Sequence, residues 1–324
     1  MHQIKSKGIK KTLKILGFTA AGFIILLMAA FILLQNNKIQ NYITQSVVKN
    51  LSEALDAKIE VDNVYYQFFN TILVKKLYLE DLQKDTLLFV EKVNLRFSLP
   101  HLLKGQILIQ SAELNAFQGN LVIDRTGGSN ADFLLKALSN PDKTSSSGMA
   151  FDIKKLTLKN SSFSLTNPNA KQPAKAGSFD PGKFKFNDIN TDISVNFHKQ
   201  DSITFSIRKF GAKEEFSGFA IKDVKVEAVY SSTGILVPIL QIQLPNSSIN
   251  FDPVLIGYDS VADFKNFSEK IHIMIPVRQS TLRLSDLAAF APDLKQAKGS
   301  AVLSADLSGR LSNLKLKNLK INYG

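Results

Sequence analysis

The chain has 324 residues, and its 40 Lys and Arg against 28 Asp and Glu give a formal net charge of +12. It contains no cysteine, which excludes disulfide bonds, thiol catalysis and cysteine-based metal sites. The positive charges are scattered and tryptophan is absent, so a solvated basic surface with a mild attraction to anionic headgroups explains them better than nucleic-acid binding.

An uncharged apolar stretch, Ile15–Leu34, follows five lysines in residues 1–14. A helix of this length spans about 30 Å, the thickness of the hydrocarbon core of a bilayer. The sequence therefore predicts a transmembrane helix, with the basic segment in the cytoplasm and the chain from Lys38 onwards carried across. A cleaved signal peptide is the alternative, although its apolar core would be shorter and would end at a small-x-small site. A buried core helix is disfavoured by the all-round apolarity.

Residues 36–57 carry apolar side chains every four positions, from Ile39 to Leu55, with polar side chains on the opposite side. This spacing predicts an amphipathic helix. Its apolar stripe could lie on the membrane surface or cover the end of the structure that follows. We expect the second arrangement, because an open end of a sheet needs a cover.

From Ile59 onwards the hydrophobic period changes to two, which is typical of β-strands. One eight-residue frame recurs, apolar-x-apolar-x-x-apolar-x-apolar. The two-residue gap shifts the alternation by one, so a bulge, bend or turn must lie there if the apolar side chains are to stay on one face. Sheets that curl around an apolar interior need such corners. The copies are Ile59–Tyr66, Ile107–Leu114, Phe151–Leu158, Phe219–Val226 and Leu314–Ile321, and Phe184–Thr191 matches in all but the last position.

These patterns predict a mainly β protein in which residues 58–324 form an elongated, curved β-sheet groove with an apolar interior, built from about fifteen strands. Two short helices are expected, Asn130–Ala137 and Leu284–Phe290, the second with Ser285 as its N-cap. The last alternating segment stops at Gly324 without a polar cap, so we expect the sheet to continue in a longer protein.

The sequence has no recognisable catalytic constellation. The four histidines are far apart, and no nucleophile-elbow, phosphate-loop, dinucleotide or calcium-loop motif occurs. Asp81 and Asp85 come nearest to a carboxylate pair, but a polar hairpin turn between Leu77–Leu82 and Leu87–Val90 explains them better. We therefore expect no enzymatic activity, no cofactor and no metal site.

The segment Leu51–Leu138 resembles the start of TamB/AsmA-like proteins of diderm bacteria. The most specific similarities are the runs Asp85–Phe89 and Leu102–Ile107 and the later stretch NADFLLKAL. The resemblance implies a long curved β-sheet folded into a groove, held at the inner membrane and extending across the periplasm towards the outer membrane. It also implies movement of phospholipid between the two membranes and, for TamB-type members, assembly of outer-membrane proteins with a barrel partner.

The expected partners are phospholipid acyl chains, the inner membrane and an outer-membrane barrel protein. Exposing a sixteen-carbon acyl chain to water costs about 13 kcal/mol at about 0.8 kcal/mol per CH₂, and an apolar groove removes most of this cost. A scaffold that pairs its sheet edge with nascent outer-membrane strands is the alternative function. An anchored hydrolase would need a polar cluster in the interior, and none is visible.

The candidate lining residues are apolar positions with matching parity, each of which could instead pack in an ordinary core. They are Phe151, Ile153, Leu156, Leu158, Phe163, Leu165, Phe184, Phe186, Ile193, Val195 and Phe197.

Overall fold

The computed structural model describes residues 45–324, apart from residues 46–47, 50–51, 54, 68–69, 103–106, 140–148, 171–172, 174, 176 and 198–201. The predicted basic segment 1–14 and transmembrane helix 15–34 lie outside the described residues, as does most of the predicted amphipathic helix 36–57. The described residues between 45 and 55 are helical, and Lys49 Nζ lies 3.9 Å from a carboxylate oxygen of Glu53, one turn further on.

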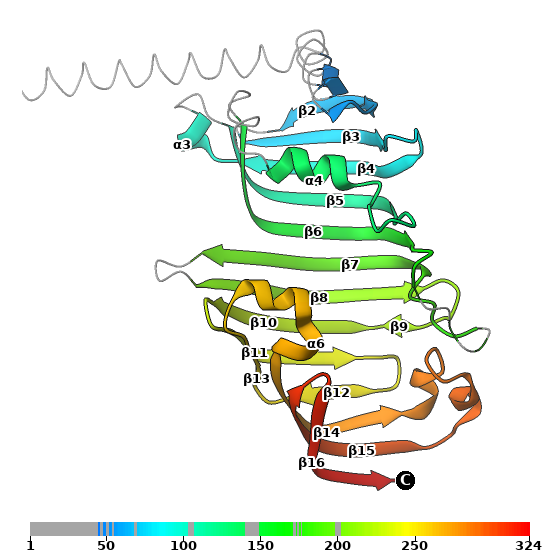
Figure 1. The fold of residues 1–324 in the computed structure, drawn as a ribbon. Helices are drawn as coiled ribbons and strands as arrows, with labels where there is room; N and C mark the ends of the chain where they lie inside the picture. Colours follow the sequence, from blue (N-terminus) through cyan, green and yellow to red (C-terminus); the bar gives the residue numbers. More distant parts are fainter. Residues whose placement is uncertain are drawn as a thin grey trace, which may run out of the picture.

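Sixteen strands form a single sheet (Figure 1), which confirms a mainly β fold. The strands are β1 (Ile59–Glu60), β2 (Asn63–Gln67), β3 (Thr71–Glu80), β4 (Thr86–Phe97), β5 (Ile107–Val122), β6 (Met149–Thr166), β7 (Lys183–Phe197), β8 (Ile203–Glu214), β9 (Ala220–Ile221), β10 (Asp223–Ser231), β11 (Gly234–Gln243), β12 (Ser248–Phe251), β13 (Val254–Gly257), β14 (His272–Arg283), β15 (Ser300–Arg310) and β16 (Asn313–Tyr323).

The order of strands in the sheet follows the order in the sequence. Both β12 and β13 lie between β11 and β14, while β9 pairs with β8 and β2 with β3. Neighbouring strands are antiparallel, with one parallel pair, β5–β6, in the part of the chain that the structure describes. A parallel pair needs a crossover connection, and the segment between these strands contains the helix α4 (Asp132–Ser139).

The gap of every frame copy coincides with a break or a bulge, as the sequence predicts. At two of the gaps the strand is interrupted, between β1 and β2 and between β9 and β10. At the other four the pairing register shifts. For example, Ile109 pairs with Phe151, whereas Ser111 pairs with Lys155, so β6 has extra residues opposite β5. These irregularities keep the apolar side chains on both sides of each gap on one face.

Positive φ values recur in the middle of neighbouring strands. Lys76 in β3, Ala116 in β5, Asn160 in β6 and Asp188 in β7 have φ values of 51°, 53°, 49° and 54°. The register shifts beside Asn160 and Asp188, whereas it is the same on both sides of Lys76 and Ala116. Bulges bend a strand and increase its twist, so the bulges on β6 and β7 contribute to the curvature of the sheet. Gln279 in β14 and Asn318 in β16 also have positive φ.

Two buried serines satisfy backbone groups at these bulges. Ser161 follows Asn160 and is 1% exposed, and Ser280 follows Gln279 and is 0% exposed. The backbone N–H of Phe117 donates to Ser161 Oγ (3.3 Å), and that of Asn250 donates to Ser280 Oγ (2.9 Å). A bulge disrupts the ladder of hydrogen bonds, and these hydroxyls supply the acceptors that the buried N–H groups need.

The positive φ at Asn160 gives a testable prediction for stability. We expect Asn160→Ile to lower the free energy of unfolding by about 2 kcal/mol, because a β-branched residue is strained in the left-handed region. We expect Asn160→Gly to leave the free energy of unfolding nearly unchanged, because glycine adopts positive φ freely. Urea unfolding of both purified variants measures the difference, and equal losses in the two would contradict the explanation.

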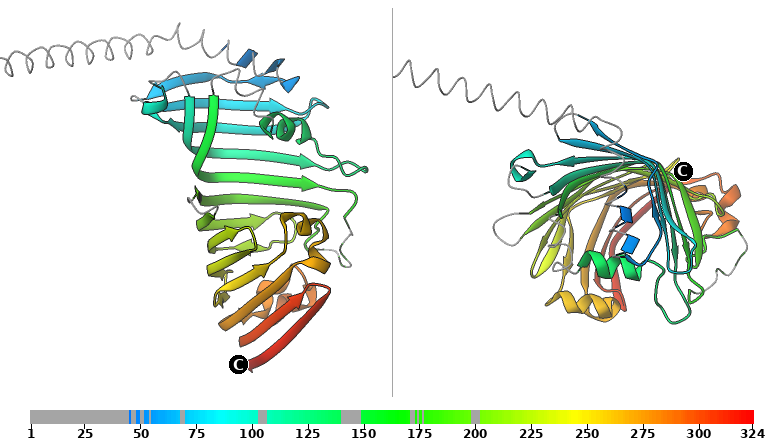
Figure 2. Two further views of the ribbon diagram at one scale, coloured as in Figure 1. Left: turned by 60° about the vertical axis from the view of Figure 1, so that its left-hand side comes forward. Right: turned by 90° about the horizontal axis from the view of Figure 1, so that it is seen from above.

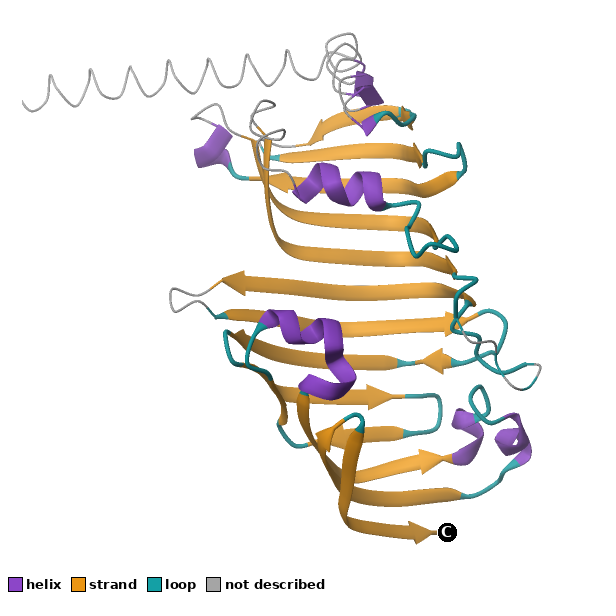
Figure 3. Cartoon of the chain, viewed as in Figure 1, coloured by secondary structure: helices purple, strands orange, loops and turns teal. Residues whose placement is uncertain are grey.

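The sheet is curved (Figure 2), and α4 lies in front of it in the view of Figure 3. Seen from above in Figure 2, the sheet forms an arch, with α4 and α6 (Phe267–Lys270) on its open side. The remaining helical segments are α3 (Leu99–Leu102), η1 (Val261–Asn266), η2 (Leu284–Leu287) and η3 (Pro292–Gln296).

Both predicted short helices need correction. The first begins at Asp132 instead of Asn130. The N–H and the hydroxyl of Ser129 both donate to the Asp132 carboxylate, while the side chain of Asn130 donates to Asp81. The second is a single 3₁₀ turn that begins at Leu284. The prediction of Ser285 as N-cap is wrong, since this residue lies inside the turn and its carbonyl accepts the N–H of Ala288.

Candidate functional site

The pairing register aligns apolar residues across eight strands, from β3 to β11. Residues directly opposite each other on paired strands project to the same face of a sheet. The aligned residues therefore form one continuous row, which we name the apolar row. Its members, each paired with the next, are Ile72, Leu95, Ala112, Leu156, Ile193, Ile207, Val226 and Leu240.

Each member of the apolar row has a neighbour in the sequence that belongs to a second row, and this second row is almost entirely polar. Successive residues of a strand project to opposite faces, so this row belongs to the other side of the sheet. The two rows together define an apolar face and a polar face in this part of the sheet. The members of the polar row, again each paired with the next, are Thr71, Arg96, Ser111, Lys155, Ser194, Ser206, Glu227 and Ile239.

The register brings the sequence-predicted lining candidates together. Leu156 pairs with Ile193, and Leu158, two residues further along β6, pairs with Thr191. The remaining candidates of β6 and β7, apart from Ile153, are paired with each other or with apolar partners on the neighbouring strands. These pairs are Phe163–Phe186, Leu165–Phe184, Val195–Phe205, Phe197–Ile203 and Phe151–Ile109, while Ile153 lies in β6 between paired positions.

The apolar row is only partly covered. Ala112 is 6% exposed, whereas the other members of the row are half-buried. The largest side chains with less than 2% exposure in the described chain are Ile271, Glu214, Val90, Ser161 and Ser280, and three of these five are polar. A sheet usually buries its apolar face under a second layer. The described residues leave much of this face accessible to other molecules.

Aromatic rings gather at one end of β7. The ring of Phe179 lies 5.5 Å from that of Phe184, 6.3 Å from that of Phe186 and 5.9 Å from that of Phe290. Phe179 and Phe290 were not among the sequence-predicted candidates, because both lie outside the strands, where no alternation marks them. The backbone N–H of Phe179 donates to the carbonyl of Ala289 (2.6 Å), which joins the segment before β7 to the segment after β14.

Glu214 places a charge next to these rings, opposite Phe186 in the register. Its carboxylate is 1% exposed and accepts the N–H groups of Phe216 (3.0 Å) and Ser217 (2.6 Å) and the hydroxyl of Ser217 (2.6 Å). Burial acts to raise the pKa of Glu214, but these hydrogen bonds outweigh it and hold the pKa below its ordinary value. The carboxylate therefore stabilises its own turn and has a structural role.

The pair Asp81 and Asp85 forms a hairpin turn between β3 and β4, as the sequence predicts. The carboxylate of Asp81 is the acceptor in this turn: its Oδ1 receives the N–H groups of Gln83 (3.0 Å) and Asp85 (2.8 Å). Asp81 is 4% exposed, whereas Asp85 is exposed. The two carboxylates therefore have different surroundings, and the side chain of Asp81 supplies the acceptor of the turn.

Asn130 connects this hairpin to α4. Its Nδ2 donates to Asp81 Oδ2 (3.0 Å) and to the carbonyl of Asn120 (3.1 Å), and its Oδ1 accepts the N–H of Val122 (3.0 Å). Asn120 in turn donates to the carbonyl of Thr86 (3.1 Å). Two of the runs that carry the sequence resemblance, Asp85–Phe89 and NADFLLKAL, are thus brought together by one polar network. The third, Leu102–Ile107, lies mostly outside the described residues.

The structure defines an elongated, curved β-sheet protein whose sheet has one polar face and one partly accessible apolar face. A comparison with protein families agrees with this class: the model of the AsmA family matches residues 9–251, well over half of the chain. The chain therefore belongs to the AsmA family, which confirms the sequence resemblance. A comparison with curated proteins found no match.

Membership of this family supports a membrane-associated protein of the cell envelope with a role in lipid transport or assembly. None of the helices in the described part of the chain combines the length and the hydropathy that a membrane span requires. The predicted span, residues 15–34, lies outside the described residues.

Proposed function

We propose that the protein is anchored in the inner membrane and carries phospholipid across the periplasm, between the inner and outer membranes. The observation that supports this most strongly is the apolar row, which crosses eight strands without a charged residue and is mostly half-buried. An acyl chain in contact with this face leaves water, and each CH₂ buried contributes about 0.8 kcal/mol.

The transfer that we propose is passive and needs no catalytic residue, cofactor or metal. A phospholipid has an apolar part that is costly to expose and a polar headgroup that is costly to bury. A curved sheet with one apolar face and one open side accommodates both, because the acyl chains contact the face while the headgroup stays in water. In this proposal residues 15–34 hold the protein in the inner membrane, with residues 1–14 in the cytoplasm.

The second candidate function is a scaffold for outer-membrane β-barrel proteins, and the strand β16 favours it. All residues of β16 are exposed, and within the described chain this strand pairs with β15 alone. Leu314, Leu316, Leu319 and Ile321 are 39%, 53%, 51% and 57% exposed. An edge of this kind can accept a further strand, from the continuation of the sheet or from another chain.

Site-specific photo-crosslinking in cells tests the lipid proposal. A photo-reactive amino acid at Ile193 or Val195, on the apolar face, is expected to capture phospholipid, detected by mass spectrometry of the crosslinked protein. The control is Asn115 of β5, which follows Leu114 and projects to the polar face, where it pairs with Lys92 and Lys159. Equal capture from both faces, or none from the apolar face, would contradict the proposal. Capture of outer-membrane proteins by crosslinkers in β16 would instead support the scaffold.

A further inference from the structure

The strands β6 and β7 separate at one end. Their last pair at this end is Lys155–Ser194. From there residues 149–154 of β6 continue beside β5, where Met149 pairs with Ile107, while residues 195–197 of β7 continue beside β8. Within the described chain, no pairing joins these two segments to each other. Figures 1 and 2 show this end of β6 turning away beside β5. We name this separation the lateral opening.

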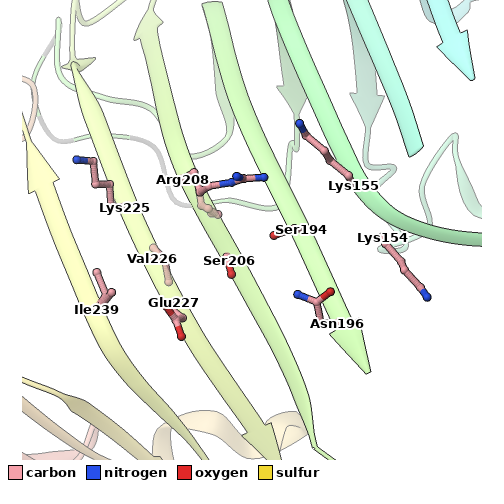
Figure 4. Close-up of a pocket in the computed structure, with 11 residues that line it drawn as sticks. Lys154, Lys155, Ser194, Asn196, Ser206, Arg208, Lys225, Val226, Glu227 and Ile239 are labelled. Carbon is pink, nitrogen blue, oxygen red and sulfur yellow. The ribbon is translucent and has the colours of Figure 1, made fainter. Parts of the chain in front are cut away.

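A hollow lies at the lateral opening (Figure 4), lined mainly by residues of the polar face together with Ile207 and Val226 of the apolar row. Its volume is about 800 Å³, within the range of small-molecule sites. Lys154 and Lys155 line it from β6, and Ser194 and Asn196 line it from β7, so it lies over the point where the two strands separate. Its charged residues are Lys154, Lys155, Arg208, Lys225 and Glu227, which is four cations against one anion.

Three of these cations are exposed and available to a ligand. Lys155, Arg208 and Lys225 are exposed, and none of them forms an ion pair with another residue of the described chain. Figure 4 shows them on three different strands around the hollow. An excess of unpaired positive charge in a concavity attracts anions, and Lys and Arg are the usual partners of phosphate. The hollow therefore fits a phosphate-bearing group.

The pairing that separates the two faces of the sheet is interrupted at the lateral opening, beyond Lys155–Ser194. Residues of both faces border it, Lys155 and Asn196 on the polar face and Leu156 and Val195 on the apolar face. A molecule with an anionic head and an apolar tail could contact both faces here without crossing an intact part of the sheet. Elsewhere between β6 and β7 the paired backbones close the sheet.

We propose that the hollow binds the phosphate of an anionic amphiphile whose apolar tail passes through the lateral opening to the apolar face. This inference rests on the proposed function, because it takes the apolar face as the surface that receives lipid. It adds the residues that hold the phosphate headgroup, in the hollow, and a route onto the sheet from the side.

Calorimetric titration of the full chain in detergent tests this inference, with dihexanoyl phosphatidylglycerol as the amphiphile and glycerol 1-phosphate as the free phosphate. The triple variant Lys155→Gln, Arg208→Gln, Lys225→Gln removes the unpaired cations. We expect its Kd for phosphatidylglycerol to rise about tenfold, since exposed charge pairs contribute little individually and three are removed together. We expect glycerol 1-phosphate to bind more weakly than phosphatidylglycerol, because it has no tail.

The matched control removes the same charge from another strand, by Lys315→Gln, Lys317→Gln and Lys320→Gln in β16, and its Kd should equal that of the unmodified protein. An unchanged Kd in the first triple variant would overturn the inference. Equal affinities for glycerol 1-phosphate and phosphatidylglycerol, both lost in the triple variant, would also overturn it, in favour of a site for free phosphate. Crosslinking at Ile193 separates the two proposals. If Ile193 captures lipid but the Kd of the triple variant for phosphatidylglycerol is unchanged, only the inference about the lateral opening is overturned. If Ile193 captures no lipid, the proposed function itself is overturned.

Discussion

The variant Val195→Asp is expected to reduce phospholipid transfer by about a hundredfold, which corresponds to a rise of about 3 kcal/mol in the barrier. Val195 pairs with Phe205, two residues beyond Ile193 of the apolar row. A carboxylate at this position would lose water whenever an acyl chain passed over it, and that loss is costly. Transfer of a fluorescent phospholipid between donor and acceptor vesicles by the purified protein measures the effect.

Asn115→Asp is the matched control for this prediction. It adds the same charge to the polar face in β5, where residue 115 pairs with Lys92 and Lys159. We expect it to keep transfer within about twofold of the unmodified protein, because a carboxylate beside two lysines on the polar face is not in the path of the acyl chains. The apolar face would lose its assigned role if both variants transferred lipid equally well, or if both failed while remaining folded.

The second large effect is expected from Asp81→Leu, which should lower the free energy of unfolding by about 3 kcal/mol. The substitution removes the acceptor of three hydrogen bonds, from the N–H groups of Gln83 and Asp85 and from the side chain of Asn130. Since Asp81 is 4% exposed, water does not readily replace the lost acceptor. Urea unfolding followed by circular dichroism measures the change.

Asp85→Leu serves as the control, because this carboxylate is exposed. We expect it to change the free energy of unfolding by less than about 0.5 kcal/mol. Hydrogen exchange adds a second measurement: in Asp81→Leu the amides of α4 should exchange faster, since Asn130 loses its link to the hairpin. Similar destabilisation by the two substitutions would show that the turn does not depend on the carboxylate of Asp81.

The main features of the sheet follow from local sequence patterns. Strand alternation is a property of a few consecutive residues, and each gap in the frame predicts a break or bulge because parity must be restored. The gap at Lys154 and Lys155 is an example, since the register shifts there. The pairing of Leu156 with Ile193 also follows from the need to keep apolar residues on one face.

Other features depend on distant parts of the chain. The sequence does not distinguish a parallel β5–β6 pair from an antiparallel one, because both strands alternate in the same way. The hollow at the lateral opening combines Lys155, Arg208 and Lys225 from three strands, and only the final register brings them together. The sequence-predicted candidates are all apolar residues of strands. The three cations are therefore not among them because they are charged, and Phe179 is not among them because it lies in a loop.

The hydrogen bond between Phe179 and Ala289 constrains how the molecule can deform. It joins segments next to β7 and β14, and β8, β10, β11 and β12 lie between these strands. Lys175 and Asp293 form an ion pair between the same two segments. These links fix the spacing of the strand ends along one rim of the arch. The place where β6 and β7 part lies at the other end of β7 and outside the linked strands, so these links do not restrict its width for bulkier cargo.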